Sequence, residues 1–169
     1  ETDVSRITAA LSEAITATIA GQENWRLVGE LFFRFFPGAA FSFSNYNPHA
    51  SVPCTAYGVN WDPDFVRSFE EHFHAMNPWT KYWEKRPAGD IMTSESVLPA
   101  STLKGRPFYE DWIKPQKDVD AGAGIKLKGE GGWVLHTAIH YPVRFAPVYD
   151  PAMVEILRRI RRTMTLAID

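Results

Sequence analysis

The chain has 169 residues, 45% of them hydrophobic, and this length and composition fit one globular domain. Its 18 basic and 20 acidic residues give a net charge of −2, which argues against a dedicated nucleic-acid-binding domain, since such domains are usually basic. The single cysteine, Cys54, excludes an internal disulfide and favours a cytoplasmic location, and no apolar run reaches the ~20 residues needed to span a membrane.

The N-terminal part of the chain predicts two amphipathic helices. Apolar residues recur at helical spacing over 3–20, and Gly21 ends that pattern. A second helix over about 23–36 carries aromatic residues on one face and is stopped by Pro37-Gly38. We expect both helices to pack through these apolar faces.

The apolar period then changes from helical to alternating. Residues 39–44 alternate apolar and small polar side chains, which is typical of a half-buried strand. Turn residues at 45–48 lead into a second strand over 52–61, on which Tyr57 and Trp61 are expected to share a face. This segment therefore predicts a hairpin.

The central part of the chain predicts short helices. One begins at Asp62-Pro63 and runs to about residue 75, and a shorter one begins at Asn77-Pro78. A helical turn covers 107–113, and we expect residues 86–107 to form the only long connection.

A second hairpin and a closing helix complete the predicted fold. Strands over 119–128 and 133–142 flank a glycine-rich turn, and the two glycines inside the first strand indicate close approach of a backbone or a ligand. A helix over about 150–168 follows. Because hairpins build antiparallel sheets and β-α-β alternation is absent, we expect an α+β domain with helices packed on the faces of an antiparallel sheet.

Tests for catalytic and metal chemistry are negative. His136 and His140 share a strand face, but four residues of strand span ~13 Å, too far for joint coordination of one metal ion. Cys54 has no histidine close in sequence, and neither a nucleophile elbow nor a phosphate-binding glycine motif is present. We expect no enzyme activity, no metal and no cofactor.

The aromatic residues predict a binding site. They make up 14% of the chain, and rings with a few polar groups are how small-molecule pockets are built. A packed core that uses the same rings is the alternative. The candidate ligand-binding residues are Phe43, Tyr57, Trp61, Asn77, Trp79, Tyr82, Trp83, Asp90 and Trp112.

One stretch resembles a known family. Asn77-Pro78-Trp79, Gly89-Asp90 and above all the run from Phe108 to Gln116 (Phe-Tyr-x-Asp-Trp-x-x-Pro-Gln) are similar to the N-terminal sensory region of LuxR-type bacterial transcriptional regulators. The resemblance implies a GAF- or PAS-like sheet of about five strands. It also implies a helix-turn-helix DNA-binding domain outside residues 1–169. We expect residues 1–169 themselves to form a single sensory domain.

The resemblance is incomplete where its lactone-binding branch has a Trp-x-x-x-Tyr pair ahead of an Asp-Pro. Here Asp64, Ser68 and Asn77 stand at the corresponding places. The carboxylate that would bind a lactone amide is therefore missing, and we expect either another small molecule or no ligand rather than a homoserine lactone.

The main hypothesis is a ligand-responsive sensory domain of a regulator, working as a homodimer because half-site DNA recognition calls for two-fold pairing. It would contact DNA only through the further domain and would not contact a membrane. Two alternatives remain open. One is an enzyme on the same scaffold that uses Cys54, Asp90 or His136, and the other is a dimerisation module without a ligand.

Overall fold

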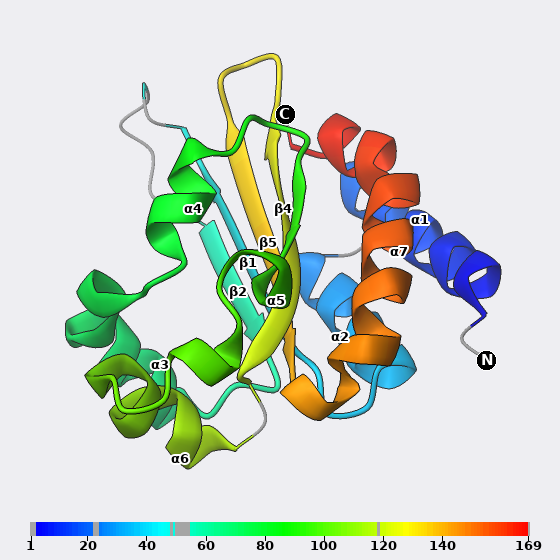
Figure 1. Ribbon diagram of the computed structural model, residues 1–169. Helices are drawn as coiled ribbons and strands as arrows, with labels where there is room; N and C mark the ends of the chain where they lie inside the picture. The colour runs from blue at the N-terminus through cyan, green and yellow to red at the C-terminus, as the bar shows by residue number, and fades with distance from the viewer. Residues whose placement is uncertain (1–2, 22–23, 48, 50–54, 118, 169) are drawn as a thin grey trace.

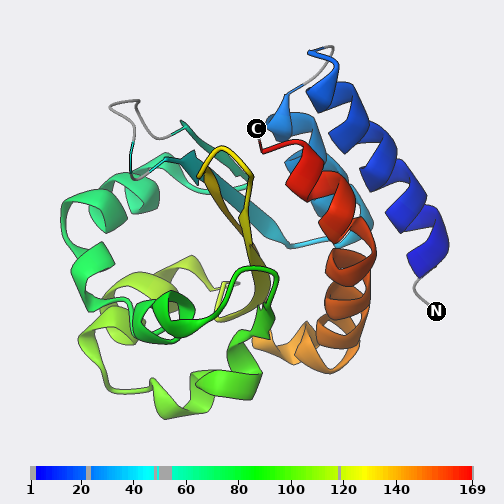
Figure 2. The ribbon, with the colours of Figure 1, turned by 90° about the horizontal axis from the view of Figure 1, so that it is seen from above.

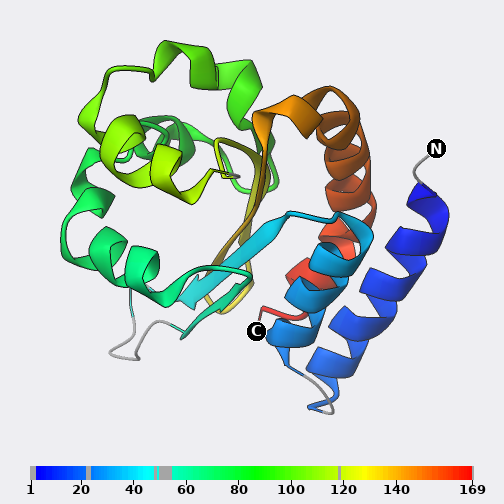
Figure 3. The same ribbon diagram turned by 90° about the horizontal axis from the view of Figure 1, so that it is seen from below.

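A computed structural model describes residues 3–21, 24–47, 49, 55–117 and 119–168. A central sheet separates two unequal layers of helices (Figure 1). On one side lie α1 (Val4–Ile19), α2 (Trp25–Phe35) and α7 (Ala146–Leu166). The other side is covered by the shorter segments of the middle of the chain, as the views along the sheet show (Figures 2 and 3).

The sheet has five strands in the order β2-β1-β5-β4-β3, and every neighbouring pair is antiparallel. The strands are β1 (Ala40–Tyr46), β2 (Thr55–Val59), β3 (Ile91–Thr93), β4 (Ala121–Lys128) and β5 (Val134–Tyr141). The expected α+β class, antiparallel sheet and strand number are confirmed. Residues 52–54 of the predicted second strand lie outside the described residues.

Short helices connect β2 to β3 and β3 to β4. They are α3 (Pro63–Glu71), η1 (Phe73–Met76), α4 (Thr80–Lys85), α5 (Ser94–Val97), η2 (Ala100–Thr102), the π-helix η3 (Phe108–Ile113) and α6 (Lys114–Gln116). The expected irregular connection over 86–107 is wrong, because it contains β3, α5 and η2. After β5, η4 (Val143–Phe145) leads into α7, which begins four residues earlier than expected.

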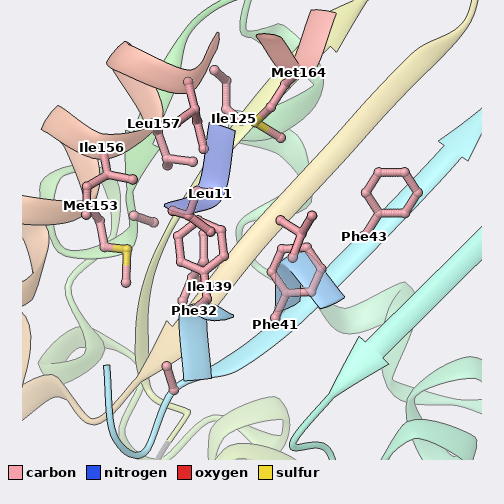
Figure 4. Close-up of a cluster of buried hydrophobic side chains, with 14 of the residues drawn as sticks. Leu11, Phe32, Phe41, Phe43, Ile125, Ile139, Met153, Ile156, Leu157 and Met164 are labelled. Carbon is pink, nitrogen blue, oxygen red and sulfur yellow. The ribbon is translucent and has the colours of Figure 1, made fainter. Parts of the chain in front are cut away.

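The main core lies between the sheet and the layer of α1, α2 and α7 (Figure 4). Leu11, Phe32 and Ile139 are fully buried there, and the ring of Phe41 stacks on that of Phe32 with centroids 5.7 Å apart. The apolar faces predicted for the first, second and last helices are the faces that point into this core. Burial of large apolar side chains is the main stabilising contribution to such a layer.

We expect Gly29→Ala to lower the free energy of unfolding by about 1–3 kcal/mol, because a Cβ atom at this position of α2 would overpack the core. It would clash with the ring of Phe41 and lie 2.8 Å from Cγ2 of Val59. This cost exceeds the gain of about 1 kcal/mol in helix propensity. Urea unfolding measures the change. Glu30→Ala on the exposed side of the same helix should stay within about 0.5 kcal/mol, and a more stable Gly29→Ala would contradict the close approach of α2 to β1.

Candidate functional site

The outer face of the central strand, turned away from the main core, is not fully packed. Along β5, Leu135, Thr137 and Ile139 are buried, whereas the alternate residues His136, Ala138 and His140 are only half-buried. The short helices between β2 and β4, which we call the cover, lie over this face (Figures 2 and 3). A covered central strand in a fully packed layer would be buried on both faces, so the partial exposure of these three residues distinguishes this face from the main core. We call this half-buried face of β5, together with the side chains around it, the hollow.

Small side chains form the floor of the hollow. Ala138 of β5 is paired with Ser42 of β1 on one side and with Gly124 of β4 on the other. Strands lie about 4.8 Å apart, so this row gives a strip of about 10 Å with almost no side-chain volume. The next rows on either side of this strip contain His136 and His140.

The two glycines of β4, Gly122 and Gly124, lie unusually close to neighbouring atoms, as glycines inside a strand had indicated. A Cβ atom at Gly124 would lie 2.7 Å from the carbonyl oxygen of Thr137 and 3.1 Å from the indole ring of Trp83. At Gly122 it would lie 2.6 Å from the carbonyl oxygen of Ile139. The expectation of close backbone approach is therefore confirmed, and at Gly124 an aromatic ring of the cover also comes close to the strand.

One end of the hollow is closed by indole rings. Trp61 stacks on Trp112 with ring centroids 6.1 Å apart, and its edge meets the imidazole of His140 at 5.2 Å. The Trp61 indole N–H donates to the carbonyl oxygen of Phe41 at 2.9 Å, and that of Trp112 donates to the carbonyl oxygen of Phe65 at 3.0 Å. Both rings are thus held in place by their polar atoms, as buried tryptophans usually are.

The opposite end is formed by Trp83 and Tyr46, whose rings meet the imidazole of His136 at centroid distances of 5.7 and 5.8 Å. Lys126 of β4 donates from Nζ to the carbonyl oxygens of Trp83 at 3.1 Å and Glu84 at 3.4 Å. A lysine at the C-terminal carbonyls of a helix satisfies their unpaired acceptors. Lys126 thereby ties α4 to the sheet.

Both histidines of the hollow are neutral at physiological pH. Burial lowers the pKa of His136 to about 4, with a smaller effect from the positive charge of Lys126. Burial also lowers the pKa of His140 to about 4, against the opposing effect of a hydrogen bond to the backbone of Val119. Within the described residues Nε2 of His136 has no hydrogen-bond partner. The two imidazoles are therefore uncharged polar groups, and the ammonium group of Lys126 lies beside His136.

The tryptophans singled out from the sequence lie on the covered side of the sheet. Trp61, Trp79 and Trp112 belong to, or pack against, a second apolar cluster beneath the short helices. The indole N–H of Trp79 donates to the carbonyl oxygen of Leu98 at 3.3 Å, and its ring meets Phe108 edge-on. This cluster holds the cover together. Its buried members are Ala40, Leu103, Phe108, Trp112, Ile113 and Val119.

Phe43 and Tyr57 lie on the other face of the sheet. Phe43 stacks on Trp25 of α2 at 4.4 Å and contacts Tyr57 at 5.9 Å, so both belong to the main core. The expectation that Tyr57 and Trp61 share a face is wrong. Asn60 between strand and tryptophan has a left-handed backbone (φ 61°), which interrupts the alternation of the strand and sends Trp61 to the covered side.

The predicted polar residues have local partners. Asn77 accepts a hydrogen bond from the backbone N–H of Trp79 at 3.1 Å, which fixes the turn into α4. Asp90 pairs with Arg86 at 3.6 Å, and Lys81 lies over the ring of Tyr82 at 5.0 Å. Across the described ranges no hydrogen bond or ring contact joins the predicted residues Asn77, Tyr82 and Asp90 to the rings around the hollow. Those rings belong to Tyr46, Trp61, Trp83 and Trp112.

The candidate site residues that were not predicted from the sequence to bind a ligand are His136, His140, Ser42, Ala138 and Lys126. The spacing of the two histidines did show that they share a strand face, but the pair was tested only for metal binding, and His136 was otherwise named only in the enzyme alternative. In the parts of the chain that the structure describes, no group of three potential metal ligands is found. None of the helices in these parts combines the length and apolar character needed to cross a bilayer.

Comparison with known proteins gives a clear result only for the fold. No family model and no curated protein matches the sequence. The N-acylhomoserine lactone-dependent LuxR-family transcription factor CepR2 from Burkholderia cenocepacia is similar with a TM-score of 0.65 and 7% identity, covering 99% of both chains. The LBD domain of VqsR from Pseudomonas aeruginosa has a TM-score of 0.64 and 14% identity, covering 96% of this chain and 94% of that one.

A structure of SdiA in complex with octanoyl-rac-glycerol matches less well, with a TM-score of 0.44 and 9% identity over 98% of this chain and 66% of that one. The fold of this chain is that of the ligand-binding domains of LuxR-family regulators. The fold implied by the sequence resemblance is thereby confirmed.

Proposed function

We propose that this chain is the ligand-responsive sensory domain of a LuxR-type transcriptional regulator and that the hollow is its ligand site. The observation that carries the proposal is the half-buried outer face of β5, which lies under an aromatic cover in a fold shared with ligand-binding domains. Unfilled space lined by rings and a few neutral polar groups is the usual form of a small-molecule site.

The two faces of the sheet provide a route for the response. A ligand in the hollow contacts the outer face of β4 and β5, and α7 packs against the inner face of β4. Ligand contacts to both floor and cover favour one arrangement of the two layers over others. The resulting shift of population changes the presentation of α7 to a DNA-binding domain elsewhere in the regulator.

A homoserine lactone is not the ligand that we propose. Asp64 is exposed and pairs with Arg67, and the hydroxyl of Ser68 donates to the carbonyl oxygen of Phe65 at 2.9 Å. Asn77 is used in its local turn. The position that would supply a carboxylate to the lactone amide holds Asn77, and the carboxylate of Asp64 is exposed and paired with Arg67.

An enzyme on the same scaffold is not favoured. Asp90 is paired with Arg86, and His136 is surrounded by Tyr46, Trp83 and Lys126. No interaction joins Asp90 to His136 in the described residues, and Cys54 lies outside them. General acid–base or nucleophilic chemistry needs at least two such groups within hydrogen-bond reach.

A homodimer and a cytoplasmic location complete the proposal. The inward face of α7 is occupied by the core, since Ile160 is fully buried, so a second copy would have to use exposed apolar residues such as Val154 and Leu166. Mass measurement in solution of the wild type and of Leu166→Glu tests this. A monomeric wild type would overturn the dimer and the dimerisation-module alternative together.

Ala138→Phe tests the proposed ligand site. Because its neighbours on the floor are Ser42 and Gly124, the added ring should enter the hollow and change the free energy of unfolding by less than about 1 kcal/mol. Ligand-dependent thermal stabilisation by any active compound in a metabolite panel should be lost. Differential scanning fluorimetry and native mass spectrometry measure both effects.

The matched control is Ala9→Phe on the exposed side of α1, which should keep the ligand response. Loss of several kcal/mol of stability in Ala138→Phe would mean that no room for a ring exists above the floor, and the proposed site would then be abandoned.

A further inference from the structure

A groove of about 350 Å³ lies beside the C-terminal end of α7. It runs between the last turns of this helix and the connection from α4 to β3, which passes next to them (Figure 1). Arg161, Arg162 and Leu166 line it on the helix side, and Gly89 and the end of β4 at 127–128 line it on the other. The groove shares no lining residue with the hollow.

The cationic side chains of this groove have no carboxylate partner within the described residues. The arginines at 158–159, earlier on the same helix and outside the groove, both pair with Glu155 at 2.6 Å. In the part of the chain that the structure describes, Arg161, Arg162 and Lys128 form no ion pair, and no acidic side chain lines the groove. The groove therefore carries an excess of positive charge.

Arg161 is placed at the groove by a single weak contact. Its Nη1 donates to the carbonyl oxygen of Gly89 at 3.4 Å, and its side chain forms no other hydrogen bond within the described residues. A guanidinium has five N–H donors in a planar fork that fits a carboxylate with two parallel hydrogen bonds. Most of the donors of Arg161 can therefore serve an acidic partner.

The groove also carries apolar surface. Leu166 is 65% exposed, the largest exposed fraction among the big apolar side chains that the structure describes. The buried Leu127 and Ala88 contribute to the same lining. Covering such surface removes it from water and favours association. An occupant that suits the groove thus combines carboxylates with at least one apolar side chain.

This combination favours a protein segment over other classes of ligand. Small-molecule pockets bury most of their ligand, whereas Lys128, Leu166 and both arginines of the groove are exposed. Nucleic acid is mostly contacted through its phosphates, which offer no apolar partner for the leucine, and the net charge of −2 opposes its approach. An acidic protein segment supplies both kinds of contact.

We propose that the groove is the docking site for an acidic, amphipathic segment of a partner protein. Carboxylates of that segment pair with Arg161, Arg162 and Lys128, and an apolar side chain covers Leu166. This interaction goes beyond the proposed function, because docking at the groove requires no ligand in the hollow.

Fluorescence anisotropy with a labelled peptide of about twelve residues tests the proposal on the full chain. The peptide carries glutamate on one helical face and leucine on the other, and two analogues replace every glutamate by glutamine or every leucine by serine. We expect the acidic amphipathic peptide to bind at least about tenfold more tightly than the glutamine analogue and about fivefold more tightly than the serine analogue.

Two double variants of α7 separate the groove from the net charge. Arg161→Gln with Arg162→Gln should weaken binding about tenfold, since one exposed ion pair contributes a factor of about five at most. Arg158→Gln with Arg159→Gln removes the same charge outside the groove and should keep binding within about twofold. Thermal unfolding checks that both variants are folded, and Ala138→Phe in the hollow should bind the peptide like the wild type.

Several results would overturn the inference while leaving the proposed function intact. Equal weakening by the two double variants would show that only the net charge acts. Equal binding of the glutamine analogue, or no binding of the acidic peptide up to about 1 mM, would remove the acidic partner. Tighter binding of a DNA duplex, lost in the Arg161 and Arg162 variant, would assign the groove to nucleic acid. A changed oligomeric mass of that variant would assign it to a second copy of this chain.

Discussion

Replacing Trp112 with alanine is expected to lower the free energy of unfolding by about 3–5 kcal/mol, the usual cost of removing a large buried aromatic side chain. The side chain is 8% exposed and contacts the rings of Trp61, Phe69 and Phe108. Its removal also leaves the carbonyl oxygen of Phe65 without its indole donor. Because these contacts hold the cover together, ligand binding in the hollow should be lost as well.

The conservative variant Trp112→Phe distinguishes packing from the hydrogen bond. It keeps an aromatic ring in the cluster but removes the indole N–H, so a loss of about 1–2 kcal/mol is expected. Urea unfolding gives the global values. Hydrogen exchange of Trp112→Ala should show faster exchange in α3 and η3 than in β4 and β5, because the main core on the other side of the sheet stays intact.

Equal loss of protection in α7 and in the cover would contradict this separation. It would show that the two apolar clusters unfold as one unit and that the cover has no independent mobility for admitting a ligand. The two clusters share the sheet but not their buried side chains, which is why we expect different responses.

The helices of the main core and the two hairpins were predictable because their signals are local. Apolar residues at helical spacing predict α1, α2 and α7, and strict alternation predicts β1. The spacing of the apolar residues identifies the buried face of each element, and this does not require knowledge of the elements that pack against it. The strand order could not be read in this way, because pairing of β1 with β5 joins segments about ninety residues apart.

Short elements escaped prediction for a related reason. Strand β3 has three residues, too few to show alternation, and it is a strand only because it pairs with β4. The left-handed backbone of Asn60 is likewise invisible in a count of alternating positions. One such residue was enough to place Tyr57 and Trp61 on opposite faces of the sheet.

The aromatic residues of the candidate site could be predicted from the sequence, whereas the small residues that form its floor could not. Tryptophans in the middle of the chain are unusual enough to indicate a shared environment, and the structure gathers four of them over one face, namely Trp61, Trp79, Trp83 and Trp112. The floor depends on register: Ala138 becomes important only because Ser42 and Gly124 lie beside it. A small residue carries no signal until its neighbours are known.

Acid is expected to destabilise this domain between about pH 6.5 and pH 4 through the two histidines of the hollow. The pKa of each falls from its ordinary value of 6.5 to about 4 in the folded chain, mainly because burial disfavours the imidazolium. In this range the unfolded chain binds more protons than the folded one. The free energy of unfolding therefore decreases as the pH falls through this window and is unaffected by these groups above it.

A shift of one pKa unit corresponds to 1.36 kcal/mol, and both side chains keep partial contact with solvent, so we expect a combined loss of about 2–3 kcal/mol rather than the full value. Burial raises the pKa of Asp150, which acts in the opposite direction, so the comparison must be made between variants. Urea unfolding at pH 7 and pH 5 should give a smaller difference for His140→Phe than for the wild type, while the exposed-site variant His72→Phe should match the wild type. A pH dependence in His140→Phe equal to that of the wild type would mean that burial does not lower the pKa of His140 in the folded chain.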